Sequence, residues 1–174
     1  MYDLGREGDR ITLGPGSKKA CNRAITTARE IGLSAVILLS ATVPPNPTWK
    51  GITMGKVAQE YIARAAPDVI TAFHEARWFN TIGEIWALVE YLKLHSPARP
   101  VANVIIAVKW WHAPRTAMIT HLLFTQVGIE TRWSIRTHWL GLGRQWWRTL
   151  AHEIGGFVRN RAFIRAHIRG GIAS

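Results

Sequence analysis

Cysteine is almost absent from the 174 residues, and Cys21 is the only one. A single thiol excludes an internal disulfide and a zinc site built from cysteines. A small buried residue on a helix is a more common role for such a cysteine than a catalytic thiol. The seven histidines are scattered, without the spacing that places two ligands on one face of a helix. We therefore expect no dedicated metal site.

Long apolar stretches are also missing. No run reaches the roughly 18 to 20 residues that a membrane-spanning helix needs. Residues 1–10 alternate charge and glycine and have no apolar core of a signal peptide, so we expect no export by that route and a cytoplasmic location. The chain has neither a phosphate-binding P-loop motif nor the Gly-x-Ser-x-Gly motif of α/β-hydrolases. The familiar signatures of those two enzyme classes are thus absent.

Acidic residues are scarce: 11 Asp and Glu stand against 22 Lys and Arg, which gives a formal net charge of +11. The imbalance is greatest at the end of the chain, where Glu153 is the only acidic residue after Glu130. Such a surplus favours anionic partners, namely nucleic acid, a phosphorylated small molecule or an acidic membrane surface.

Short apolar runs alternate with amphipathic stretches along the chain. The runs at residues 35–41, 69–73 and 103–108 are typical of buried strands, and residues 129–136 alternate weakly, as a last strand would. Helices are expected at 17–31, 53–65, from 81 onward, at 114–128 and at 145–167. This alternation predicts an α/β fold: a Rossmann-like three-layer sandwich with a mostly parallel sheet of four or five strands and a C-terminal helix. The length favours one domain, 1–174.

Local signals support several of these helices. Ser17 is the expected N-cap of the first helix and Gly32 its stop. Thr81 and Glu84 have the spacing of a capping box, and Pro114 suits the first turn of a later helix. The helix after Thr81 carries apolar residues at helical intervals: Ile82, Ile85, Trp86, Val89 and Leu92.

Ligands in parallel α/β sheets bind at the carboxyl ends of the strands, so the loops there are the places to search. After the third strand come Lys109, His112 and Arg115. The helix start favours an anion, Arg115 and Lys109 add donors, and His112 is suited to proton transfer near neutral pH. Taken alone, a helix cap at His112 and a surface ion pair at Arg115 are the more common roles.

Polar residues also follow the first two strands. Asn80, Thr81 and Glu84 suit ligand binding, although capping alone explains them better. Glu75 has no capping duty at its strand end, so we predict a catalytic or ligand-holding role for it beside His112. Ser40 offers a hydroxyl to the same crevice.

The order of these residues resembles the ElyC/SanA/YdcF family, a bacterial domain of unknown function. The matching pieces run from Leu4 to Gly128: Leu4-Gly5, Arg23 or a neighbour, 37–40 ending in Ser40, Asn80-Thr81 with Glu84, and 104–108 followed by His112 and Arg115. The chain departs from the pattern at Ala41, where the family has glycine, and its first strand is nearly absent.

The resemblance implies a Rossmann-like sheet and a nucleotide-type ligand such as S-adenosylmethionine. It also implies a link to cell-envelope processes, which some members serve from a membrane anchor. We expect this chain to have no such anchor and therefore to be more similar to the soluble branch of the family.

The end of the chain, 140–174, is expected to be a basic, Trp-rich helical extension. Tryptophans and arginines together suit single-stranded nucleic acid or an anionic membrane surface. Core packing or the contact of a homo-oligomer is the more common use of such residues.

Two hypotheses follow. In the first, the chain binds an anionic or nucleotide-like small molecule at the strand ends, with or without catalysis. In the second, it is a non-enzymatic module that binds nucleic acid or membrane through its C-terminal region.

Overall fold

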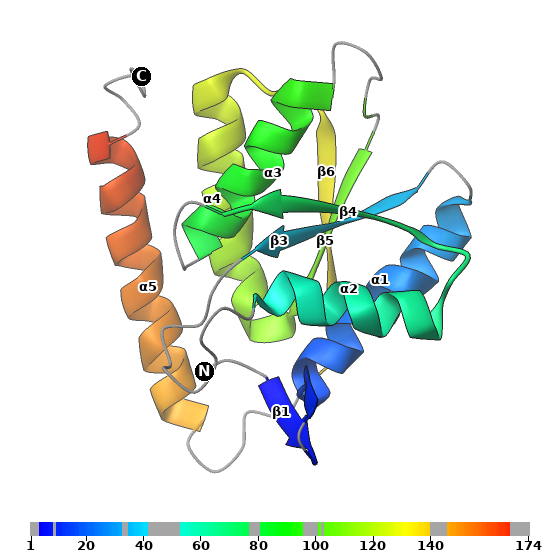
Figure 1. Cartoon of the computed structure of the whole chain (residues 1–174). Coiled ribbons are helices and arrows are strands. Elements are labelled where there is room, and N and C mark those ends of the chain that lie inside the picture. Colours follow the sequence, from blue (N-terminus) through cyan, green and yellow to red (C-terminus); the bar gives the residue numbers. More distant parts are fainter. Residues whose placement is uncertain are drawn as a thin grey trace. The chain divides into compact units, whose positions relative to one another are not determined.

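The computed structural model describes residues 4–8, 10–32, 35–41, 53–76, 81–95, 101, 103–139 and 146–167. Helices and short strands alternate along these residues, so the chain belongs to the mixed α/β class (Figure 1). It divides into two compact units, Met1–Leu88 and Val89–Ser174. The single domain expected for 1–174 stays a prediction.

The first unit opens with a hairpin that the sequence analysis did not predict. Strands β1 (Leu4–Glu7) and β2 (Arg10–Leu13) pair antiparallel, with Leu4 opposite Leu13. Gly8 lies in the turn with a φ of 62°, a left-handed conformation that glycine adopts without steric cost. The sequence led us to expect almost no first strand, but β1 is present as a short strand and pairs with β2.

Two helices and a parallel strand pair follow the hairpin in this unit. Helix α1 (Pro15–Ile31) precedes β3 (Val36–Ala41), and α2 (Met54–Ala65) precedes β4 (Ile70–Glu75). Strands β3 and β4 pair in parallel, and α1 and α2 both contact β3. The buried residues of this unit form one core, which consists of Leu13, Cys21, Ile25, Ala28, Ile37, Val57, Ala58, Ile62 and Ala66. Burial raises the pKa of the Cys21 thiol to about 11, which keeps it protonated and unreactive at neutral pH.

Capping residues explain where α1 and α2 begin and end, but the start of α1 differs from the prediction. Helix α1 begins at Pro15 rather than after Ser17, because proline suits the first helical turn and Gly14 precedes it. The predicted cap at Ser17 is therefore wrong, whereas the stop at Gly32, with a φ of 95°, is confirmed. Thr53 caps α2, since its Oγ1 accepts a hydrogen bond from the Lys56 amide at 3.2 Å.

Helix α3 (Thr81–His95) begins at the predicted residue. The five apolar residues predicted to share its buried side are all buried: Ile82, Ile85, Trp86, Val89 and Leu92. The helical spacing in the sequence is confirmed here.

The second unit contains a continuous strand–helix–strand segment. Strand β5 (Asn103–Lys109) leads through the short 3₁₀ helix η2 (Trp110–His112) into α4 (Ala113–Val127), and β6 (Arg132–His138) returns parallel to β5. Gly128 ends α4 with a φ of 70° and donates its amide to the Phe124 carbonyl. Within the weakly alternating stretch 129–136, residues 132–136 therefore do form a strand, which continues to His138.

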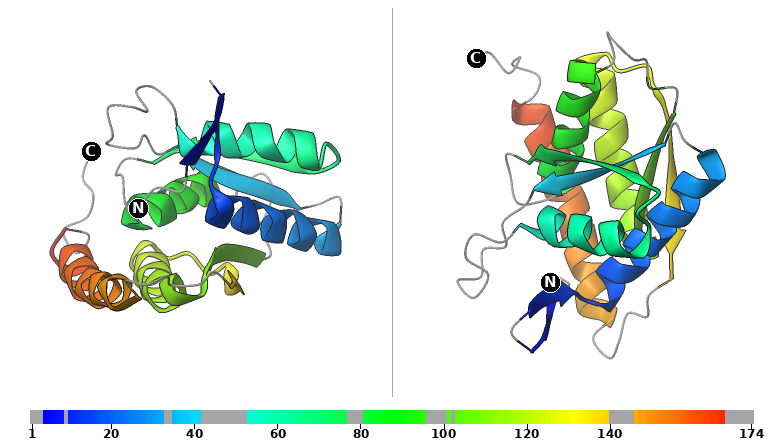
Figure 2. Two further views of the ribbon diagram at one scale, coloured as in Figure 1. Left: turned by 90° about the horizontal axis from the view of Figure 1, so that it is seen from below. Right: turned by 45° about the vertical axis from the view of Figure 1, so that its right-hand side comes forward.

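Helix α5 (Trp146–His167) lies alongside α4 (Figures 1 and 2). Ile164 of α5 and Ile119 and Leu123 of α4 are fully buried in this unit. The helix runs unbroken through Gly155 and Gly156. Within the described part of the chain, no helix is long and apolar enough to cross a membrane.

Candidate functional site

Three side chains that are distant in sequence meet at the carboxyl end of β5. His112 ends η2, Arg115 lies in the first turn of α4, and Glu153 comes from the middle of α5. Glu153 Oε2 lies 2.9 Å from His112 Nδ1 and 3.0 Å from Arg115 Nε. Arg115 Nη2 lies 3.0 Å from the same His112 nitrogen. We call this group the His–Arg–Glu cluster.

The cluster is buried on one side and open on the other. The side chains of Arg115 and Glu153 are each 10% exposed, whereas that of His112 is 33% exposed. The Arg115–Glu153 ion pair is therefore mostly shielded from water, which strengthens the attraction and holds both groups in place. His112 is the member of the cluster that a molecule from solvent can reach.

The backbone of α5 makes room for this ion pair. Gly156 lies one turn after Glu153, and a Cβ at this position would overlap with Arg115 Nη1. Glycine allows the guanidinium to approach the helix closely. Within the Gly155-Gly156 pair, Gly156 thus has a packing role.

His112 Nδ1 has two polar partners, Glu153 Oε2 at 2.9 Å and Arg115 Nη2 at 3.0 Å. Nδ1 donates to the carboxylate in the tautomer that carries its proton there, and it accepts from the guanidinium in the other tautomer. In the tautomer that donates to Glu153, Nε2 is the proton acceptor of the neutral ring. Among the described residues, nothing lies within hydrogen-bonding distance of Nε2.

Tryptophans lie at the carboxyl ends of β5 and β6, and two of them, Trp110 and Trp111, directly precede His112. Lys109 of β5 pairs in register with His138 of β6, and each is followed by a tryptophan. The rings of Trp110 and Trp139 stack 5.1 Å apart with an angle of 5° between them, and Trp139 is mostly exposed. Lys109 Nζ lies 5.9 Å from the Trp111 ring centroid. The edge of this strand pair therefore combines flat apolar rings with positive charge.

The sequence pointed to only part of this cluster. His112 and Arg115 of the cluster were predicted, as was the neighbouring Lys109, but Glu153 and the adjoining Gly156 were not. A usable signal for Glu153 existed, because it is the only carboxylate among eight arginines between residues 132 and 174. Its helical position was predicted, but the distance of 41 residues from His112 hides their contact in the sequence.

The other predicted site residues belong to the first unit. Ser40 pairs with His74 and Ala41 with Glu75 in the β3–β4 ladder, so the carboxyl ends of these strands align as expected. The side chains of Ser40 and Glu75 lie outside the described residues. Their roles as ligand-binding and catalytic groups stay predictions.

Residues 80–84 are described only from the start of α3. Asn80 lies outside the described residues, Thr81 is half-buried at the first position of the helix, and Glu84 is exposed in its first turn. The predicted roles of these three residues in ligand binding therefore stay predictions.

Within the described ranges, no group of three or more His, Cys, Asp or Glu side chains is placed to hold a metal ion.

The chain was compared with protein-family models, with curated proteins and with solved structures, and it matches none of them.

Proposed function

We propose that the chain binds an anionic or nucleotide-like small molecule at the carboxyl ends of β5 and β6, with His112 Nε2 as a proton acceptor. The observation that carries this proposal is the 2.9 Å contact between His112 Nδ1 and Glu153 Oε2. A carboxylate that accepts from one ring nitrogen fixes the tautomer and leaves the other nitrogen as the proton acceptor, as in many general bases.

The neighbouring groups suit the rest of such a ligand. The exposed Trp139 ring, stacked on Trp110, offers a flat surface to a base or another planar ring. Lys109 supplies a positive charge nearby for a phosphate or carboxylate. The guanidinium of Arg115 is occupied by Glu153, so in this proposal Arg115 orients the carboxylate. S-adenosylmethionine is one ligand with a flat ring and a carboxylate.

The finer fold is part of the same proposal. Parallel pairing in both units and helices between successive strands support a Rossmann-like three-layer sandwich with a sheet of four or five strands. Together with the residue order from Leu4 to Gly128, they support membership of the ElyC/SanA/YdcF type.

Thermal stabilisation by nucleotides, S-adenosylmethionine and sugar phosphates tests the proposal. The intact chain should be stabilised by one of these ligands, and His112→Ala should abolish the shift while the protein stays folded. His121→Ala is the matched control, because His121 is exposed on α4 and takes no part in the cluster. Equal shifts in both variants would reject the proposal.

A second variant separates orientation from proton transfer. His112→Asn keeps a donor near the position of Nδ1 but has no atom in place of Nε2. It should preserve the folded stability better than His112→Ala and still lack any activity that depends on proton acceptance. Full activity of His112→Asn would exclude Nε2 as the acceptor.

The outward side of α5 favours a second candidate function. Trp147, Ile154 and Val158 follow one another at intervals of seven and four residues, which places them on one side of the helix, and Ile154 and Val158 are 67% and 63% exposed. The only acidic residue of α5, Glu153, is buried in the His–Arg–Glu cluster.

Arginines flank this apolar stripe. Arg148, Arg159 and Arg161 lie beside it and Arg165 lies beyond its end, and all four are exposed. A helix with exposed apolar side chains between cations is suited to an anionic phospholipid bilayer, because the apolar groups enter the interface while the arginines reach the headgroups. Only one of the three residues of the stripe, Trp147, has a ring that can stack on bases, so the stripe fits a bilayer better than nucleic acid.

Sedimentation with vesicles tests this second function. The full chain should bind phosphatidylcholine vesicles that contain phosphatidylserine, and binding should fall at high salt. The double variant Ile154→Ser/Val158→Ser should bind about tenfold more weakly. The control Ile31→Ser/Leu94→Ser removes two exposed apolar residues elsewhere and should change binding little. Binding to single-stranded oligonucleotides but not to vesicles would overturn the proposal, as would equal losses in both variants.

A further inference from the structure

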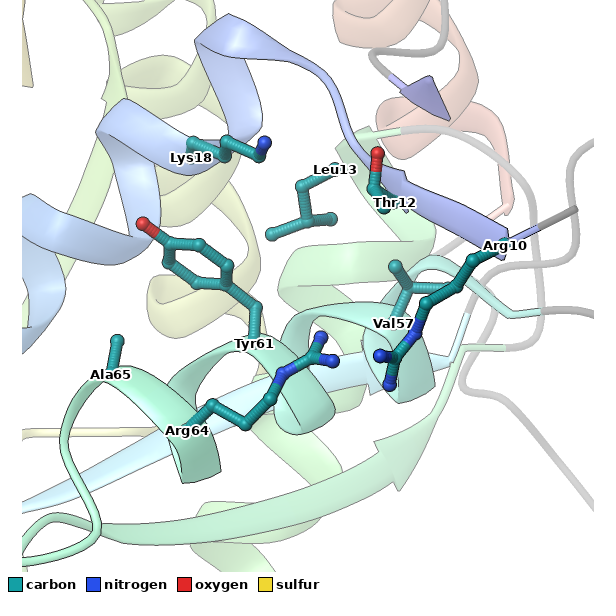
Figure 3. Close-up of a pocket in the computed structure, with 8 residues that line it drawn as sticks. All are labelled: Arg10, Thr12, Leu13, Lys18, Val57, Tyr61, Arg64 and Ala65. Carbon is teal, nitrogen blue, oxygen red and sulfur yellow. The ribbon is translucent and has the colours of Figure 1, made fainter. Parts of the chain in front are cut away.

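The first unit contains a hollow that lies apart from all the residues discussed so far as functional. It is bounded by β2, α1 and α2 and has a volume of about 310 Å³ (Figure 3). Three basic side chains line it, Arg10 from β2, Lys18 from α1 and Arg64 from α2. We call this space the basic hollow.

Regular spacing in each element brings these residues to the hollow. Val57, Tyr61 and Arg64 are four and three positions apart in α2, so they share one side of the helix. Arg10 and Thr12 are two positions apart in β2 and point to the same side of the strand. Lys18 lies in the first turn of α1, where the positive end of the helix dipole adds to its charge.

The described side chains that line the hollow are rich in positive charge. Three of them are basic, and none of those described is acidic. Arg10 Nη2 lies 3.8 Å from Glu60 Oε2, and both of these side chains are more than half exposed. An exposed contact of this length contributes little, so Arg10 remains available to a stronger anion. An anion placed in the hollow is attracted by all three cations.

The floor and one wall of the hollow are apolar. Leu13 and Val57 are buried and belong to the core of the first unit. The Tyr61 hydroxyl donates to Asn22 Oδ1 at 2.9 Å, which fixes the orientation of the Tyr61 ring at the wall. Figure 3 shows this ring and Leu13 facing the space that the three cations surround. A bare inorganic ion would leave these surfaces uncovered, whereas an organic phosphate would cover them.

We propose that the basic hollow binds a small phosphorylated molecule. Its phosphate group lies among Arg10, Lys18 and Arg64, and its apolar or planar part lies against Leu13 and Tyr61. The guanidinium groups of two arginines offer paired donors that match phosphate oxygens. This site is independent of the His–Arg–Glu cluster, since all of its residues belong to the first unit.

Calorimetric titration of the full chain with pyrophosphate tests the phosphate site. Arg64→Gln should weaken binding at least tenfold, which corresponds to about 1.4 kcal/mol. Lys56→Gln is the matched control: Lys56 is an exposed cation on the same helix, outside the hollow, and its loss should change the affinity less than twofold. Equal weakening by both variants would show only general charge attraction and would overturn the proposal.

Two further variants test where pyrophosphate binds. His112→Ala should leave pyrophosphate binding intact, and its loss in that variant would assign the anion to the second unit and overturn the proposal. Lys18→Gln should reproduce the effect of Arg64→Gln, which keeps the test valid if one variant is unstable.

Adenosine monophosphate and phosphatidate-containing vesicles then distinguish a soluble ligand from a lipid headgroup. Binding of either one that depends on Arg64 supports the site. If the intact chain binds neither of them nor pyrophosphate at millimolar concentrations, the proposal fails.

Discussion

Glu153 shows how much of the candidate site depends on one residue that is far away in the sequence. Its Oε2 atom contacts both Arg115 and His112, so one carboxylate neutralises a buried cation and orients an imidazole. The chemistry of His112 thus depends on α5. The strand-end loop that carries His112 provides only half of the arrangement.

Removal of this negative charge should destabilise the fold. Glu153→Gln keeps the shape of the side chain but leaves the shielded Arg115 guanidinium without its counter-charge, at a cost of about 3 kcal/mol in the free energy of unfolding. Urea denaturation measures this loss. Glu130→Gln removes an exposed carboxylate and should stay within about 0.5 kcal/mol of the parent. Similar stabilities for the two variants would contradict the structural role of Glu153.

The two adjacent glycines of α5 should respond in opposite ways to alanine. At Gly156 the added methyl group would overlap with Arg115, so Gly156→Ala should lower the free energy of unfolding by about 1 to 3 kcal/mol. At Gly155 the nearest atom, Arg159 Nη2, is 4.0 Å away, so Gly155→Ala should raise it by about 0.5 to 1 kcal/mol. Chemical denaturation of both variants measures the difference, and the same sign of change in both would contradict the packing described here.

The residue scale also shows a limit of sequence reasoning. His112 and Arg115 could be predicted because a strand end and a helix start are local patterns. The contact with Glu153 could not, because it depends on how α5 packs on α4, which no short pattern encodes. For the same reason the sequence suggested Arg115 as an anion ligand, whereas the structure shows its guanidinium already paired.

At the scale of elements, the predicted helices and strands match the structure closely where periodicity is strong. Helix α3 begins at the predicted Thr81, and β5 begins at the predicted Asn103. The β1–β2 hairpin was missed because four-residue strands are too short to show a clear alternation. The pairing of β5 with β6 was expected only from the general rule for strand–helix–strand units, and the register confirms it.

An ion pair between two elements gives the structure a dependence on pH. Arg29 at the end of α1 donates from Nε and Nη2 to Asp68, which precedes β4, at 2.9 and 2.7 Å. The hydrogen bonds from Arg29 hold the pKa of Asp68 below its ordinary value. Because the pKa is lowered on folding, the stabilisation is present above the unfolded pKa and is lost as the pH falls through the folded pKa.

Asp68→Asn should therefore lower the free energy of unfolding at pH 7, where the carboxylate is charged, and have a much smaller effect in strong acid. The effect should be small because both side chains are exposed. Urea denaturation across the acidic range measures it. If the loss in the free energy of unfolding caused by Asp68→Asn grew as the pH fell, the result would contradict the role of this ion pair.

Considered as a whole, the molecule carries a large surplus of positive charge, +11, with few carboxylates to offset it. This surplus was evident from the sequence, whereas the burial of Glu153, which removes a negative charge from the exposed side of α5, was not. The division into two units was not anticipated either, since length alone favoured one domain.

Self-repulsion of this charge should make the thermal stability depend on salt. An increase in sodium chloride from about 20 to 200 mM shortens the range of the repulsion, so the midpoint of thermal unfolding should rise by a few degrees. Scanning calorimetry of the intact chain measures this. A midpoint that falls with salt would mean that attractive ion pairs outweigh the net repulsion.

The segment from β5 to β6 has one more consequence, for insertions and deletions. Every residue of β5 pairs with the residue 29 positions later, from Asn103 with Arg132 to Lys109 with His138. The combined length of η2, α4 and the turn at Gly128 therefore sets the register of β6 on β5. One residue added there would slide β6 along β5 and turn its inward side chains to the opposite face. We expect homologous chains to vary in length outside this segment and to keep its length constant.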